Sequence, residues 1–112
     1  MNITWQFATA VVNIGHLKAE DLRAMQDNAL SPAGNYGLYW LNNIADSLLV
    51  RPTQTDDWEE MLKRIGVSDE ALENIRKVLA GGFDAVQFHP DADQVDELTY
   101  LHEEECEGVD GT

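Results

Sequence analysis

Apolar and polar residues alternate over the first part of the chain. Between Asn2 and Asn13 the odd positions form one face, made by Ile3, Trp5, Phe7, Thr9 and Val11. A period of two, rich in β-branched and aromatic side chains, is typical of a half-buried strand. We therefore predict a strand over residues 2–13, ended by the polar and Gly-containing run Asn13–Gly15.

The spacing then changes to that of a helix. Leu22, Met25 and Ala29 recur every three or four residues from Lys18 onwards, and acidic residues in the first turn suit the positive end of the helix dipole. This pattern predicts a first helix up to Ala29. The run Ser31–Asn35 contains both Pro and Gly and is expected to break it.

Residues 55–65 have the features of a second helix. Thr55 is placed to cap its N-terminus, and Asp56 and Asp57 stand in its first turn. One face is apolar and the other carries two oppositely charged pairs four residues apart. The apolar residues are Trp58, Met61, Leu62 and Ile65, and the pairs are Glu59 with Lys63 and Glu60 with Arg64. Gly66 is the stop signal.

Residues 68–80 predict a third helix with clear ends. Ser68 is its N-cap, acidic residues begin it, basic residues stand in its last turns, and Gly81 ends it. Its buried face is expected to consist of Ala71, Leu72, Ile75, Val78 and Leu79.

Further strands are predicted on both sides of this helix pair. Tyr36–Asn43 and Asp46–Pro52 are apolar runs of strand length that we expect to form a hairpin, with a helical turn inside Leu41–Leu49 as the alternative. Phe83–His89 predicts another strand. Glu97–His102 is either a last short strand or an extended segment.

The order strand, helix, hairpin, helix pair, strand predicts an α+β fold. We expect a small mixed or antiparallel sheet of about four strands, with about three helices packed on one face. No repeat and no Ser/Gly linker divides the 112 residues. Residues 1–112 are therefore expected to form a single domain, ending in an unstructured acidic tail over about residues 103–112.

Charge is distributed unevenly along the chain. The net charge is −14, from 21 acidic and 7 basic residues, and every basic residue lies at or before Lys77. The first 77 residues hold eleven acids, a balance of 7 − 11 = −4, and the remaining 35 hold ten acids and no base, a balance of −10. Such a segment repels phosphates, so it disfavours direct DNA or RNA binding and favours a protein partner with a basic surface.

Three features indicate the compartment. The first thirty residues lack the basic start and long apolar core of a secretory signal, the apolar runs are far shorter than the ~20 residues of a membrane span, and Cys106 is the single cysteine. We expect a cytoplasmic protein that binds no membrane.

His89, Asp91 and Asp93 are the best candidates for a small metal-binding or hydrolytic module. They open an oxygen-rich run of the kind that holds a hard cation. An EF-hand loop starting at Asp91 would, however, place Val95 at a ligand position. We therefore keep this module as the alternative function and expect no metal and no cofactor.

Zinc or cysteine chemistry would need residues from distant parts of the chain. His16, His89, His102 and Cys106 would have to converge, because no CxxC or HExxH motif is present. Reactive thiolates need positive neighbours, whereas Cys106 is surrounded by glutamates. With no GxSxG, P-loop or GxGxxG motif either, the chain is expected to be non-enzymatic and to have no catalytic residues.

Aromatic residues are expected to belong to the core. A base-stacking platform requires basic residues beside the rings, and these are scarce. We expect the rings to be buried with their polar tips at the core's edge: Trp5, Tyr36, Tyr39, Trp40 and Trp58.

Carboxylates at regular spacing can imitate a nucleic acid. Side chains three or four apart on a helix are about 5–6 Å apart, close to the spacing of successive phosphates. If residues 90–110 were helical, five acids would share one face: Asp93, Asp96, Glu103, Glu107 and Asp110. The alternative is a solvated surface whose acidity serves solubility only.

Three sequence segments resemble an uncharacterised family of small acidic proteins carried by phages, prophages and plasmids. The first runs from Thr9, in the predicted strand, to the Gly-His-Leu run Gly15–Leu17. The other two are the helix start Gly66–Ile75 and the segment Gly81–Leu101. One departure is His89, which stands where the family has an acidic residue. The resemblance implies a mobile-element origin and an accessory role against host defence.

Taken together, these features lead to one expected function. We expect an inhibitor of a host nucleic-acid-handling defence system, of anti-CRISPR or anti-restriction type, that binds a basic protein surface. The expected partner-binding residues are Asp84, Asp91, Asp93, Asp96, Glu97, Glu103, Glu104, Glu105 and Glu107.

Overall fold

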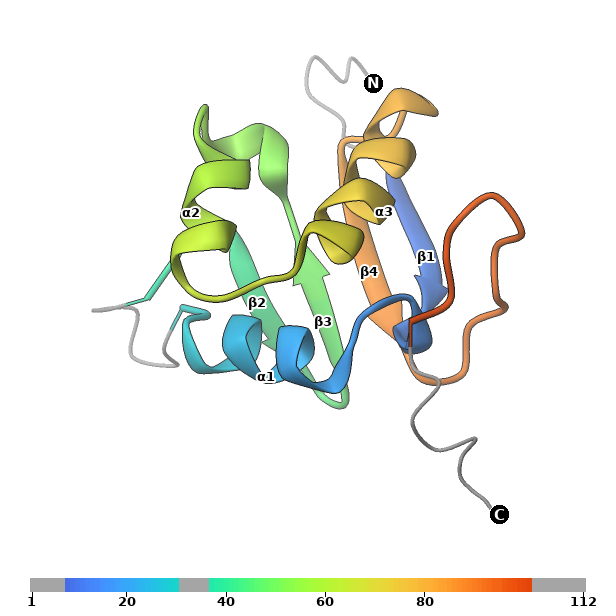
Figure 1. Ribbon diagram of the computed structural model, residues 1–112, viewed down its shortest axis with the longest axis horizontal. Helices are drawn as coiled ribbons and strands as arrows, with labels where there is room; N and C mark the ends of the chain where they lie inside the picture. The colour runs from blue at the N-terminus through green and yellow to red at the C-terminus, as the bar shows by residue number, and fades with distance from the viewer. Residues whose placement is uncertain (1–7, 31–36, 102–112) are drawn as a thin grey trace, which may run out of the picture.

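The computed structural model describes residues 8–30 and 37–101, which fold around one four-stranded sheet (Figure 1). Its elements follow in chain order. They are β1 (Thr9–Asn13), the 3-10 turn η1 (Ile14–His16), α1 (Ala19–Asp27), β2 (Leu41–Ile44), β3 (Ser47–Val50), the 3-10 turn η2 (Pro52–Gln54), α2 (Trp58–Arg64), α3 (Asp69–Ala80) and β4 (Ala85–His89).

The sheet is mixed, with the strand order β1-β4-β3-β2. The edge strand β1 pairs in parallel with β4, placing Thr9 opposite Ala85 and Asn13 opposite His89. The pairs β4 with β3 and β3 with β2 are antiparallel. The first and last strands of the described residues therefore lie side by side.

All three α-helices cover the same face of the sheet (Figure 1). The strand side chains of one face are apolar and buried: Val12, Leu41, Leu48, Val50, Val86 and Phe88. They join buried helix and loop residues in one core, including Leu17, Met25, Trp40, Leu62, Leu72 and Ile75. The predicted α+β class, with four strands and three helices on one face, is confirmed.

The third helix begins and ends where its sequence signals stand. Ser68 Oγ accepts a hydrogen bond from the Ala71 N–H at 3.3 Å, and Gly81 is the C-cap. Ala71, Leu72, Ile75 and Val78 are buried and Leu79 is partly buried, as the spacing predicts.

The second helix starts later than predicted. It begins at Trp58, after an Asp57 N-cap that makes no side-chain capping bond, and the Thr55 N–H bonds to the Pro52 carbonyl to close η2. Pro52 favours this preceding 3-10 turn, so the prediction of Thr55 as a helix cap was wrong. Glu60 pairs with Arg64 as expected.

The hairpin is confirmed, and the helical alternative within residues 41–49 was wrong. Ile44 pairs with Ser47 across a two-residue turn formed by Ala45 and Asp46. Ala45 has φ +54°, the left-handed conformation that such tight turns require.

Some predictions fall outside the described residues. These are the part of the first strand over residues 2–7, the break at residues 31–35, and the tail at 103–112. The strand alternative for Glu97–His102 finds no support as far as Leu101, because residues 96–98 form a turn and no ladder follows. Among the helices that the structure describes, none is long and apolar enough to cross a membrane.

Candidate functional site

Five predicted partner-binding acids lie around β4, and we call them the acidic flank: Asp84, Asp91, Asp93, Asp96 and Glu97. Asp84 precedes β4, and the other four belong to the segment 90–101, which runs beside β1 (orange to red in Figure 1). These four are exposed and Asp84 is half-buried. Glu103, Glu104, Glu105 and Glu107 lie outside the described residues.

Four basic residues are paired with acids of α2 and α3. The ion pairs are Lys18–Glu70 at 3.4 Å, Lys63–Asp69 at 3.9 Å, Arg64–Glu60 at 3.5 Å, Arg76–Glu59 at 3.2 Å and Arg76–Glu73 at 3.5 Å. Every acid in these pairs comes from the first 77 residues. Within residues 8–30 and 37–101, no carboxylate of the acidic flank has a cationic partner. The uneven charge along the sequence is therefore also uneven in space.

Asp84 has a structural contact as well as a charge. Its Oδ2 accepts a hydrogen bond from the Ala8 N–H at 2.9 Å, and its backbone N–H donates to the Ala8 carbonyl at 2.8 Å. The Thr53 hydroxyl donates to its carbonyl at 3.1 Å. Asp84 therefore holds the start of β1 against β4, which leaves less of its carboxylate for a partner than the other four acids have.

Asn13, at the end of β1, holds the first half of the segment 90–101. Its side-chain amide donates to the Ala92 carbonyl at 2.8 Å and to the Pro90 carbonyl at 3.4 Å, and its backbone N–H donates to the Asp93 carbonyl at 3.2 Å. These bonds occupy backbone groups only. The carboxylates of Asp91 and Asp93 stay in solvent on a fixed backbone.

His16 and Asn74, both buried to 1% exposure, hold the second half of the segment. The Val95 N–H donates to His16 Nε2 at 3.0 Å, so Nε2 carries no proton and Nδ1 donates to the Thr99 carbonyl at 3.1 Å. Asn74 bonds both backbone groups of Thr99. The loop that carries four of the acids is thus tied to the core at several points.

Close packing at Gly15 adds a further restraint. The Leu101 N–H donates to the Gly15 carbonyl at 2.8 Å. A Cβ at this glycine would collide with the ring of Tyr100, which packs edge-on against His16 at 5.8 Å between ring centroids. Glycine therefore lets the Tyr100 ring take this position, which a Cβ would displace.

The helical arrangement considered for residues 90–110 is wrong over the part that the structure describes. Residues 91–101 contain turns and extended backbone with no helix. Pro90 and the tethers from Asn13, His16 and Asn74 impose this path. The acids therefore follow a loop and do not repeat along a helix face.

His89, Asp91 and Asp93 do not assemble a metal site among the residues that are described. No group of three His, Cys, Asp or Glu side chains is close enough there to hold an ion. His89 Nδ1 instead accepts the Asp91 N–H at 3.0 Å, which closes the turn after β4. His16 has both ring nitrogens in hydrogen bonds, and His102 and Cys106 lie outside the described part of the chain.

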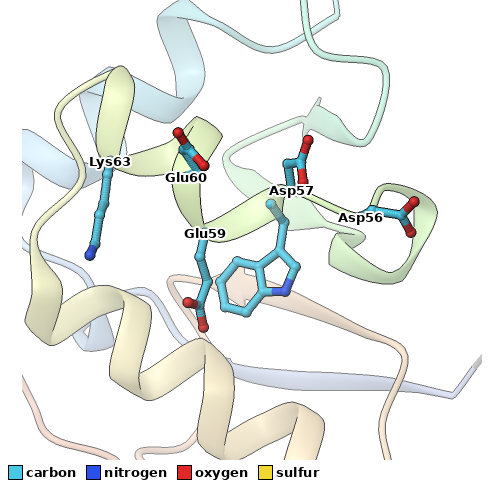
Figure 2. A pocket seen from close by; sticks show the side chains of 6 residues that line it. Asp56, Asp57, Glu59, Glu60 and Lys63 are labelled. Carbon is cyan, nitrogen blue, oxygen red and sulfur yellow. The ribbon is translucent and has the colours of Figure 1, made fainter.

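A second acidic surface lies at the start of α2, and the sequence patterns missed it. A hollow of about 500 Å³ is lined by Asp56, Asp57, Trp58, Glu59, Glu60 and Lys63. Figure 2 shows Asp57 and Glu60 on one side of the helix start and Glu59 directed to the other side, towards α3, where it pairs with Arg76. They share no common point, so this hollow adds negative charge but no chelating geometry.

Asp21 is a buried carboxylate that the sequence assigned only to a helix start. Its Oδ1 accepts the Ser68 N–H at 2.8 Å, and its Oδ2 accepts the Ser68 hydroxyl at 2.8 Å and the Lys18 N–H at 3.1 Å. It thereby joins the N-termini of α1 and α3. Nearby, the pKa of Glu70 lies below its ordinary value, chiefly through a backbone hydrogen bond and then through Lys18.

The aromatic residues divide between core and surface. Trp40 is buried and Trp58 partly buried, in line with the expected core role. Tyr39 is 53% exposed, so its assignment to the core was wrong, and its carbonyl accepts a hydrogen bond from Arg51 at 2.6 Å. Trp5 and Tyr36 lie outside the described residues.

The fold and the site define a small α+β protein with an open mixed sheet and a tethered acidic loop beside its parallel edge. The chain belongs to the family whose model is described as "Family of unknown function (DUF5983) C-terminal domain", which matches residues 9–103. The matched span runs from the first residue of β1 past the end of the tethered loop. The expected membership of an uncharacterised family is confirmed. Neither the curated proteins nor the solved structures that were searched gave a match.

Proposed function

We propose that this protein acts without catalysis, by binding a basic surface of a nucleic-acid-handling protein through the acidic flank. The observation that carries the proposal is that four exposed carboxylates stand together within residues 91–97 on one tethered loop, with no cationic partner in residues 8–30 and 37–101. Unpaired surface charge of one sign attracts a surface of the other sign and accelerates association.

The backbone restraints support the same proposal. An acidic loop fixed by Asn13, His16 and Asn74 loses little conformational entropy when a partner binds. A purely solubilising segment needs no such tethers.

The concrete form of the proposal is an inhibitor, acting in the cytoplasm, that competes with nucleic acid for its partner. Its target would be a restriction or CRISPR component, and its source a phage or other mobile element. The negative charge of the flank supports the competition with phosphates.

Two charge-matched variants test the proposal. The flank variant carries Asp91→Asn, Asp93→Asn, Asp96→Asn and Glu97→Gln. The control variant removes four exposed acids that form no ion pair with any residue that the structure describes: Glu20→Gln, Asp27→Asn, Asp46→Asn and Asp56→Asn. Both change the net charge equally.

Partners captured from host extract with the wild-type chain are identified, purified and titrated with all three proteins. We expect the flank variant to bind at least about tenfold more weakly and the control to stay within a fewfold, because close charge pairs exceed long-range attraction. Equal binding by all three proteins would contradict the proposal and would indicate that the acidity serves solubility only. Duplex DNA should compete with the wild-type chain for the partner.

A further inference from the structure

The outer edge of β1 forms one side of an apolar groove of about 550 Å³. The last turn of α3 and Phe83 form a second side, and the segment 95–98 forms a third. Figure 1 shows this segment beside β1. Val11 and Phe83 are 53% and 40% exposed, so apolar surface here lies open to solvent.

On the side of β1 that faces away from β4, some backbone N–H and C=O groups point outwards. In a parallel pair, alternate residues direct both their N–H and their C=O towards the neighbouring strand. Ala8 bonds to the start of β4, whereas the Asn13 N–H bonds outwards to the Asp93 carbonyl. Thr9 and Val11 share the parity of Asn13, so their N–H and C=O groups face away from β4.

An edge with free backbone groups and apolar walls is a template for an added strand. Asn13 and Asp93 close one end of the edge, and the path beside Thr9 and Val11 stays open over the described residues. Backbone pairing would hold the added strand, and the groove would receive every second side chain.

The charges around the groove indicate which kind of added strand it would bind. Glu97 lines the groove, Asp96 and Asp84 lie near it, and the one base in its lining, Lys77, donates to the Glu97 carbonyl at 3.3 Å. A second copy would bring another chain of net charge −14 to this site. We propose that the β1 edge receives an extended segment of the basic partner protein, with apolar residues at every second position and Lys or Arg between them. This inference rests on the proposed function and adds the mode of binding.

Val11 offers a way to block the edge while keeping the fold. Its N–H faces outwards, so Val11→Pro removes no bond to β4, and proline is accepted on edge strands at such positions. The proline removes the backbone N–H donor of residue 11, and its ring obstructs an incoming strand. Val11→Thr keeps the donor and the β-branched shape and is the matched control.

The experiment uses the full chain and a fluorescein-labelled peptide of alternating Val and Lys as the probe. A second probe has the same sequence with N-methyl groups on alternate backbone amides, which keeps its charge but removes the donors of one edge. We expect anisotropy titrations to show that the methylated probe binds about tenfold more weakly, because two or three backbone hydrogen bonds are lost. Val11→Pro should weaken the plain probe equally, and Val11→Thr should not.

Other outcomes separate the two proposals. Equal binding of both probes to the wild-type chain, or no binding of either, overturns strand addition, even if Val11→Pro fails to fold. If the flank variant loses a partner that Val11→Pro still binds, the proposed function stands and this mode of binding is wrong. Sedimentation of the wild-type chain and of Val11→Pro tests the remaining alternative. If the wild type is a dimer and Val11→Pro is a monomer, the edge binds a second copy of the chain and the inference is overturned.

Discussion

The side-chain amide of Asn74 holds both backbone groups of Thr99. Asn74 Nδ2 donates to the Thr99 carbonyl at 2.7 Å, and the Thr99 N–H donates to Asn74 Oδ1 at 2.8 Å. The same Nδ2 donates to the His16 carbonyl at 3.0 Å. One residue of α3 thus fastens the acidic loop to the turn that follows β1.

Asn74→Ala should lower the free energy of unfolding by about 2–3 kcal/mol, because it leaves buried donors and acceptors without partners. Urea denaturation measures the loss, and amide exchange should speed up first at Thr99. The exposed neighbour Glu73 serves as the control, since Glu73→Ala should change stability by less than about 0.5 kcal/mol. Similar values for the two variants would show that Asn74 does not hold the loop.

Asp21→Ala should cost about 3 kcal/mol of stability. The substitution removes a buried carboxylate that accepts three hydrogen bonds from Ser68 and Lys18, and bonds to a charged group are the stronger kind. Glu20→Ala, one residue earlier and exposed, should be nearly neutral. Thermal or urea unfolding compares them, and an Asp21→Ala variant as stable as Glu20→Ala would contradict the bonding described.

Ala45→Gly should stabilise the protein by about 0.5 kcal/mol. Ala45 has φ +54°, a conformation that costs an L-residue roughly 1–2 kcal/mol, and the gain is reduced by the extra freedom of glycine in the unfolded chain. Urea denaturation measures the change. A loss of stability would mean that residue 45 does not adopt this conformation in solution.

Glu70 should make a small contribution to stability that depends on pH. Its folded-state pKa lies below 4.5, so the contribution is present above pH 4.5 and is lost as the pH falls through the lower folded-state pKa. Glu70→Gln should therefore lower the melting temperature slightly near neutral pH, and the difference from wild type should vanish in acid. A difference that grows as the pH falls would show the opposite sign of the pKa shift.

The sequence predicted the helices and the hairpin because their signals are local. Ser68 and Gly81 are the caps of α3, and short runs rich in apolar residues predicted β3 and β4 with small errors at the ends. The error at Thr55 is local too, since Pro52 starts a 3-10 turn that ends at this residue.

The geometry around the acids could not be predicted, because contacts between distant residues create it. Asn13 bonds to residues 77 and 79 positions away, and His16 to one 83 positions away. From the sequence, Asn13 was predicted only to end a strand, and His16 was considered only as one of several distant zinc ligands. No sequence pattern assigned a role to Asn74. The charge imbalance was visible in the sequence, whereas the ion pairs of four basic residues, none of which involves the flank, required the fold.

The central claim is that the unpaired carboxylates of the acidic flank contact a basic partner. Calorimetric titration of the purified partner at rising salt tests it most directly, with the wild-type chain, the flank variant and the charge-matched control. We predict that affinity falls steeply with salt for the wild type and the control, and that the flank variant binds weakly with a shallow salt dependence. A flank variant whose affinity and salt dependence equal those of the control would contradict the claim.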